Sequence, residues 1–172
     1  MHAIFRRGIA ATVLAALLLA GCGGDKPVAV DKAADEAAIR QLLADVGRHF
    51  DAGDYEAMLA LYTDDVVVTA PGTPDTIGKA AWRKGIETTL PQGVKMKLRF
   101  DTQEIEIGGD LAYERGTFVV EVLDAAGAPQ PVAGGRHIHM FKRQADGSWK
   151  GWRLMENSAD PAPAVAATQV AP

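Results

Sequence analysis

The chain has 172 residues, of which 48% are hydrophobic and 23% are charged, and its formal net charge at pH 7 is −4. This length suits one domain whose core needs no disulfide, and its one cysteine cannot form an intramolecular disulfide. The acidic balance excludes general nucleic-acid binding, which depends on a basic surface. Composition therefore predicts one folded domain without a nucleic-acid partner.

The start of the chain predicts a secretory signal peptide. Arg6 and Arg7 precede an apolar stretch over residues 8–20, which is shorter than the ~20 residues that a membrane-spanning helix needs. Leu19-Ala20-Gly21-Cys22 resembles the lipobox of bacterial lipoproteins, in which the signal is cleaved before a lipidated cysteine. We expect residues 1–21 to be this signal and Cys22 to be the lipid anchor. An ordinary signal peptide followed by a chance cysteine is the alternative.

The same resemblance predicts a location in the bacterial cell envelope. Gly23 rather than aspartate follows the cysteine, which implies the outer membrane, with the protein facing the periplasm. We expect residues 22–32 to hold the lipidated cysteine and a flexible tether. Residues 159–172 are rich in alanine and proline and predict a disordered tail. Residues 33–158 remain as the folded domain.

The first half of this domain predicts three helices and a strand. Residues 33–50 carry apolar side chains at helical spacing, and Gly53 suits the left-handed position that ends a helix. Asp54 is expected to cap a short second helix, in which Met58, Leu61 and Tyr62 share one side. The β-branched residues 66–69 follow as a strand. A third helix is expected from about residue 79 to residue 90, before Pro91.

The second half predicts long strands. Apolar and polar residues alternate over 94–100, and the alternation then changes phase in 104–107, which predicts a bulge within residues 101–103. Gly108-Gly109-Asp110 predicts a hairpin turn into a strand over 111–123, and further strands are expected over 136–143 and 149–157. The order of elements predicts an α+β domain, with three helices packed on a curved antiparallel sheet and a pocket between them.

Several short motifs then resemble one family. They are Phe50–Tyr55, Leu61–Val68, Gly78–Trp82, Asp146–Lys150 and Asn157-Ser158. Their order and spacing are similar to the SnoaL-like, ketosteroid-isomerase-like group of the nuclear transport factor 2-like superfamily. The resemblance implies a cone-shaped fold. It leaves the function open, because members range from isomerases and cyclases to binding domains.

Steroid isomerisation requires a carboxylate base and a neutral hydrogen-bond donor beside an apolar pocket. By resemblance, the base belongs at Ala70, just before Pro71-Gly72, and the tyrosine of the first helix belongs near Val46. Neither side chain carries a suitable group. Ketosteroid isomerase activity is therefore not expected, although other acid/base enzymes stay open.

His137 and His139 lie two residues apart on a predicted strand and so share a face with Phe141. They form an acid/base or ligand-gripping pair on one interpretation, and a polar strand face or dimer contact on the other. A metal site needs a third ligand, and no residue at a recognisable spacing supplies one. We therefore expect no metal, and no motif predicts a cofactor.

The last strand places Trp152, Leu154 and Glu156 on one predicted face. Trp152 and Glu156 either line a pocket or belong to the core and the surface, respectively. The candidate ligand-binding residues are Trp82, Tyr113, His139, Trp152 and Asn157, and the candidate catalytic residues are His137, His139 and Glu156.

We therefore expect a lipid-anchored envelope protein that binds a small, partly apolar molecule or a protein partner. The alternative is an isomerase, cyclase or hydrolase that uses acid/base residues in the pocket. The broad sheet and the resemblance also predict a homodimer.

Overall fold

The computed structural model describes residues 31–90 and 93–158. The predicted signal peptide, Cys22, almost all of the tether, and the tail lie outside these residues. The elements are α1 (Lys32–Ala52), α2 (Tyr55–Ala60), β1 (Tyr62–Thr69), β2 (Thr76–Ile77), α3 (Lys79–Thr89), β3 (Met96–Gly108), β4 (Leu111–Leu123), β5 (Pro129–Arg143) and β6 (Trp149–Ser158). None of the helices in the described part has the length and apolar character needed to span a membrane.

The predicted helices are confirmed to within two residues, although α1 begins at Lys32 and its cap is Asp31, both of which the sequence had assigned to the tether. Asp31 accepts a hydrogen bond from the backbone N–H of Ala34 at the start of α1, and Asp54 does the same for Ala57 at the start of α2, both at 3.1 Å. Gly53 ends α1 with φ of 70°, a left-handed conformation that glycine adopts without a steric penalty. These local signals lie within a few residues of each boundary and are therefore readable from the sequence.

Tyr62 does not belong to the second helix, as the sequence had suggested. It begins β1, where it pairs with Gly151 of β6, and only 1% of its surface is exposed. Pairing with a strand at the far end of the chain thus overrides the local helical spacing. This change brings the Tyr62 ring into the domain core.

The six strands form one sheet in the order β2-β1-β6-β5-β4-β3. Neighbouring strands are antiparallel except for β1 and β6, which run parallel. The sequence predicted an antiparallel sheet and missed both this parallel pair and the two-residue β2. It also began β5 at residue 136, whereas the strand begins at Pro129.

Two irregularities decide which side chains face inward. The predicted bulge in β3 is confirmed, because the pairing with β4 shifts between Thr102 and Glu104. A second shift, in the β5–β6 pairing, leaves Trp152 as an extra residue between Gly151 and Arg153. Trp152 is therefore out of phase with Leu154 and Glu156, and the prediction that all three share a face is wrong.

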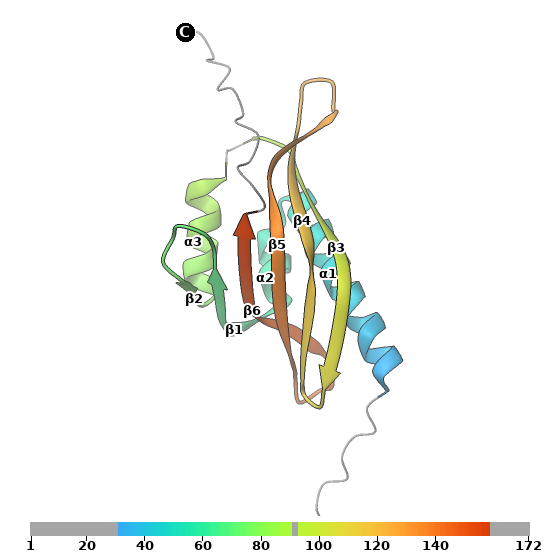
Figure 1. Cartoon of the computed structure of the whole chain (residues 1–172). Helices are drawn as coiled ribbons and strands as arrows, with labels where there is room; N and C mark the ends of the chain where they lie inside the picture. Colours follow the sequence, from blue (N-terminus) through green and yellow to red (C-terminus); the bar gives the residue numbers. More distant parts are fainter. Residues whose placement is uncertain (1–30, 91–92, 159–172) are drawn as a thin grey trace, which may run out of the picture.

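The sheet curves around the three helices, which cover one of its faces (Figure 1). The core lies between these two layers. It is built from the apolar stripe of α1, from α2 and from the inward residues of the strands. Its largest fully buried apolar members are Tyr62, Phe141, Ile39, Val46 and Val66. Residues of α1, α2, α3 and the strands together line a cavity between these two layers.

Candidate functional site

A cavity of about 590 Å³ lies between the helices and the inner face of the sheet, and we call it the cup. Its wall is largely aromatic and aliphatic; the residues include Val46, Phe50, Met58, Tyr62, Val68, Trp82, Ile86, Leu90, Leu98, Phe100, Phe118, Val120 and Leu154. This volume and lining are typical of sites for small molecules, which usually occupy ~300–1,000 Å³. The cup therefore has the dimensions and the chemistry to hold a small, mainly apolar molecule.

Polar groups enter the cup at the end of β6. Glu156, Asn157 and Ser158 line it there, and Glu156 is the one carboxylate among the described residues of the wall. Burial raises the pKa of Glu156, although the nearby His137 opposes this shift. A half-buried carboxyl group in an apolar wall can orient the polar end of a ligand or exchange a proton with it.

The predicted ligand-binding residues separate into two groups. Trp82 and Asn157 line the cup. Tyr113 and Trp152 do not: the Tyr113 hydroxyl donates to Glu104 on the outer face of the sheet, and the Trp152 indole N–H donates to Asp65 at 3.1 Å. The Trp152 ring also lies against Arg153 and Lys142, because the bulge turns it outward.

The two positions that the family resemblance associates with catalysis both line the cup. Ala70 lies at its edge near Pro71, and Val46 projects from α1. Their side chains are apolar, so neither can act as a base or donate a hydrogen bond. The base and the hydrogen-bond donor that steroid isomerisation requires are thus absent from these two positions.

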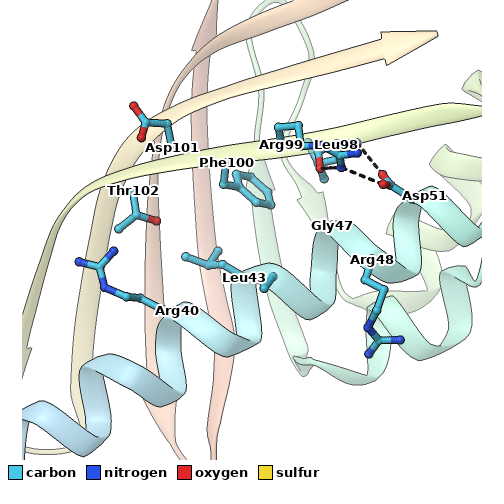
Figure 2. Close-up of a pocket in the computed structure, with 11 residues that line it drawn as sticks. Arg40, Leu43, Gly47, Arg48, Asp51, Leu98, Arg99, Phe100, Asp101 and Thr102 are labelled. Atoms are coloured by element: carbon cyan, nitrogen blue, oxygen red, sulfur yellow. Dashed lines mark hydrogen bonds and ion pairs between the residues drawn. The ribbon is translucent and has the colours of Figure 1, made fainter. Parts of the chain in front are cut away.

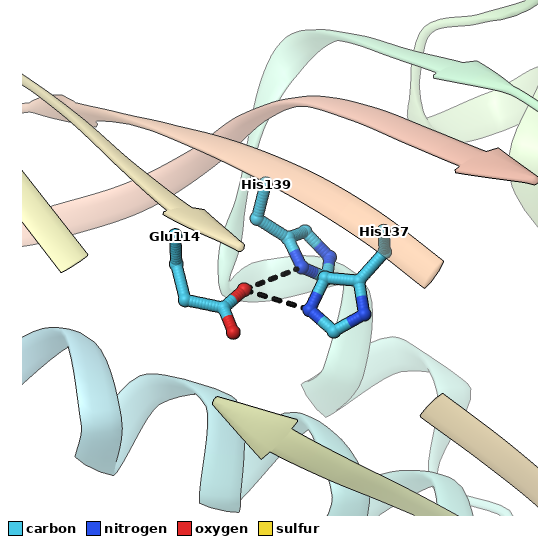
Figure 3. A group of neighbouring side chains, drawn as sticks. All are labelled: Glu114, His137 and His139. Atoms are coloured by element: carbon cyan, nitrogen blue, oxygen red, sulfur yellow. Dashed lines mark hydrogen bonds and ion pairs between the residues drawn. The ribbon is translucent and has the colours of Figure 1, made fainter. Parts of the chain in front are cut away.

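His137 and His139 point inward but lie behind the wall of the cup. The two residues are 2% and 0% exposed, their ring centroids lie 4.9 Å apart, and Glu114 of β4, also fully buried, faces both rings from one side (Figure 3). Figure 3 shows one carboxylate oxygen of Glu114 facing both imidazoles. This oxygen, Oε2, is 2.7 Å from His137 Nε2 and 3.6 Å from His139 Nδ1. We call these three residues the Glu–His–His cluster.

The electrostatics of the cluster favour an ionised glutamate beside a neutral histidine. Burial acts to raise the pKa of Glu114, but hydrogen bonds and charge from the two histidines outweigh it and lower that pKa to about 2. Burial lowers the pKa of His139, and Glu114 only partly opposes this shift. The interior thus holds a carboxylate charge close to two imidazoles.

Strand register explains how the cluster forms. Glu114 pairs directly with His139, and Gly116 pairs with His137, so the inward side chains of β4 and β5 meet. Gly116 leaves space for the carboxylate, because a Cβ at this position would lie 3.0 Å from Glu114 Oε1. Sequence reasoning missed Glu114 because the contact depends on the register between two strands rather than on spacing within one.

The cluster contacts the cup through aromatic rings. The Phe100 ring lies edge-on to His137 and His139, with centroid distances of 5.1 and 5.4 Å, and Phe100 also lines the cup. The Tyr62 hydroxyl, 3.5 Å from His139 Nε2, makes a second connection. The predicted acid/base pair is therefore screened from the cup by these two side chains.

A second, more polar groove of about 570 Å³ lies between α1 and β3 (Figure 2). At one end of it, Asp51 accepts hydrogen bonds from the Leu98 backbone N–H at 2.9 Å and from the Arg99 guanidinium at 2.8 Å. These bonds join the end of α1 to the edge strand of the sheet. The groove thus contains a structural contact, and Phe100 separates it from the cup.

Comparison with known proteins agrees with this architecture. Residues 31–155 match the profile of the SnoaL-like domain. No curated protein matches the chain. A conserved protein from Planctomyces limnophilus is 27% identical, with a TM-score of 0.64, and the match covers 74% of this chain and 98% of that one.

Two further solved structures share the fold. A nuclear transport factor 2-like protein with a cystatin-like fold from Novosphingobium aromaticivorans is 24% identical, has a TM-score of 0.65, and is matched over 77% of this chain and 87% of its own. A ketosteroid isomerase-like protein from Erwinia carotovora is also 24% identical, with a TM-score of 0.59 and coverage of 73% and 96%. The cone fold expected from the sequence is confirmed.

Proposed function

Because the chain belongs to the SnoaL-like domain family, we propose that its cup binds a small, mainly apolar molecule. The observation that carries this proposal is the cavity of about 590 Å³, whose wall is built largely from aromatic and aliphatic side chains. Burying apolar ligand surface there is favourable by ~25 cal/mol per Å². Glu156 and Asn157 orient the polar end of the ligand, since they lie together at the end of β6.

A second candidate function is acid/base catalysis in the cup. It is favoured by Glu156, whose carboxyl group lies in an apolar wall where a proton donor or acceptor is effective. An isomerase, cyclase or hydrolase of this kind differs from a simple binding protein in releasing an altered ligand. Its activity depends on Glu156 rather than on the screened histidines.

The setting of the domain is also part of the proposal. The motif ending at Cys22 supports a lipid anchor, in the outer membrane and facing the periplasm.

A homodimer is supported by apolar residues that gather on the outer face of the sheet. Tyr113 and Met140 pair across β4 and β5, Ile138 and Met155 pair across β5 and β6, and all four are exposed. Burial of this face by a second copy removes the apolar surface from water.

The cup can be tested with substitutions at Gly85. This residue lies within α3 and lines the cup, and a Cβ added there meets no atom within 4 Å. Gly85→Trp is expected to place an indole in the cavity and abolish binding of the apolar dye anilinonaphthalene sulfonate. Gly85→Ala is the matched control and should bind the dye as the parent does. Equal binding by Gly85→Trp and the parent contradicts the proposal.

Native mass spectrometry of the protein purified from its host identifies the molecule itself. A defined mass adduct is expected in the parent and in Gly85→Ala, and it should be missing in Gly85→Trp. Incubating this molecule with the parent and with Glu156→Gln separates binding from catalysis. A product formed only by the parent supports the acid/base function, whereas unchanged ligand in both samples supports simple binding.

A further inference from the structure

The Glu–His–His cluster leaves polar atoms of the core without partners. Within residues 31–90 and 93–158, no group offers a hydrogen bond to Glu114 Oε1, His137 Nδ1 or His139 Nδ1, although all three atoms are buried. Unpaired buried polar groups are costly, and a buried carboxylate is more so. In the part of the chain that the structure describes, neither Lys nor Arg contacts the carboxylate, and its ionic contacts are with the two imidazoles. The buried carboxylate therefore has only imidazoles, and no permanently charged side chain, as its ionic partners.

We propose that Glu114, His137 and His139 form a binding site for one divalent transition-metal ion of the zinc type. Two imidazole nitrogens and one carboxylate oxygen are a donor set that suits such ions, whereas calcium and magnesium favour oxygen ligands throughout. A bound cation supplies a permanent positive charge beside the buried carboxylate. It also takes as a ligand His139 Nδ1, one of the three atoms without a hydrogen-bond partner.

The positions of the donors fit this assignment. One possible ligand atom from each residue lies within 4.8 Å of the others. Metal–ligand bonds of about 2.0–2.2 Å place ligand atoms of a tetrahedral site roughly 3.3–3.6 Å apart. The distances from Glu114 Oε2, 2.7 Å to His137 Nε2 and 3.6 Å to His139 Nδ1, lie around this range. Small rotations of the Glu114 and His137 side chains, which move Oε2 and Nε2 apart, suffice to admit the ion.

The surroundings supply two further features of a metal site. His139 faces Glu114 through Nδ1, while its Nε2 faces the Tyr62 hydroxyl, and an outer partner of this kind fixes the orientation of a ligating imidazole. Glu114 Oε1 lies in the space that Gly116 leaves open and can provide a fourth donor. The three ligands are buried on all sides. The site is therefore structural and fixes β4 to β5 behind the Phe100 wall of the cup.

The test uses the full chain carrying Cys22→Ser, so that the one thiol adds no metal ligand. After treatment with a chelator, the protein is titrated with Zn²⁺, passed through gel filtration and assayed for bound metal. We expect one retained Zn²⁺ per chain and a higher midpoint of thermal unfolding. In the same background, Glu114→Gln should weaken binding by at least about tenfold, whereas His49→Ala, which removes a histidine outside the cluster, should bind as the parent does.

X-ray absorption at the zinc edge of the Cys22→Ser parent gives an answer that does not depend on how the variants fold. Two imidazoles and carboxylate oxygen around the metal support the site. A coordination shell without histidine, or zinc that is lost on gel filtration, overturns the proposal. Full binding by a folded Glu114→Gln variant overturns it as well. Dye binding in the cup is measured separately, so failure of either proposal is recognised independently of the other.

Discussion

Asp35 in the first turn of α1 and Arg143 at the end of β5 lie 108 positions apart in the chain and form a two-bond ion pair. Arg143 Nη1 donates to Oδ1 at 2.7 Å, and Nη2 donates to Oδ2 at 2.6 Å. The Trp149 indole N–H also donates to Oδ1, at 3.0 Å. One carboxylate thus joins the first helix to two strands near the end of the domain, and both side chains of the ion pair are mostly buried.

Asp35→Asn should therefore lower the free energy of unfolding by about 2–3 kcal/mol, because it leaves the Arg143 charge without its main partner. Chemical denaturation measures this change. Glu36→Gln is the matched control, since Glu36 pairs with Arg40 on the exposed side of the same helix. The control should cost no more than ~0.5 kcal/mol. If both substitutions lower the free energy of unfolding equally, the Asp35–Arg143 ion pair does not stabilise the domain as proposed.

The same ion pair predicts a pH dependence. The hydrogen bonds from Arg143, together with the one from Trp149, hold the pKa of Asp35 below its ordinary value of 3.8 against the opposing effect of burial. Because the folded pKa is depressed, this stabilisation is complete above 3.8 and is lost as the pH falls through the folded value. The stability difference between the parent and Asp35→Asn should be constant between about pH 5 and 8 and shrink below about pH 4. A difference that grows on acidification contradicts this prediction.

Gly151→Ala should destabilise the domain because the Tyr62 ring lies directly on the backbone of this residue. A Cβ at position 151 would overlap that ring, which is itself buried against Trp82 at a centroid distance of 4.7 Å. We expect a loss of about 2–3 kcal/mol in the free energy of unfolding. Gly108→Ala is the control, because a Cβ there meets no atom within 4 Å. If Gly151→Ala leaves the free energy of unfolding unchanged, the Tyr62 ring moves freely.

The homodimer proposal is tested on the outer face of the sheet. Ile138 is 43% exposed and lies between Arg115 of β4 and Met155 of β6, so Ile138→Asp places a negative charge in the expected interface. Sedimentation of the full chain with Cys22→Ser should give a dimer that this substitution dissociates. Ile77→Asp, at an exposed site on β2, should leave the dimer intact. A parent that remains monomeric at all concentrations rules the dimer out.

The lipid anchor is tested at Cys22. In the bacterial host, the parent should incorporate labelled palmitate and fractionate with membranes. Cys22→Ser should lose the label, and the chain should be released or remain as an uncleaved precursor. Retention of the label by Cys22→Ser would show that the lipid is attached elsewhere.

Much of the fold could be predicted because its signals are local. Asp54 and Gly53 act on backbone groups within four residues, and the change of alternation around Gln103 reports a bulge within one strand. The order of helices and strands then restricts the architecture to helices on one face of a sheet. These features required no knowledge of which strands pair.

The candidate site was less accessible to such reasoning because it depends on pairing between distant strands. Parity predicted that His137, His139 and Phe141 face the same way, and all three are buried together. This alternation does not reveal that Glu114 lies opposite His139, nor that Trp152 is an extra, unpaired residue that faces away from the cup. Both facts follow from register, which is set by turns and packing across the whole sheet.

The sequence by itself thus determined the local elements and the common face of the two histidines. It also determined that Val46 and Ala70 carry apolar side chains where the family resemblance expects catalytic groups. Only the tertiary structure decided that these histidines share a buried carboxylate behind Phe100, while Glu156 lines the cup. The physical reason is range: caps and alternation act over a few residues, whereas burial and charge pairing depend on side chains that are brought together from β3, β4, β5 and β6.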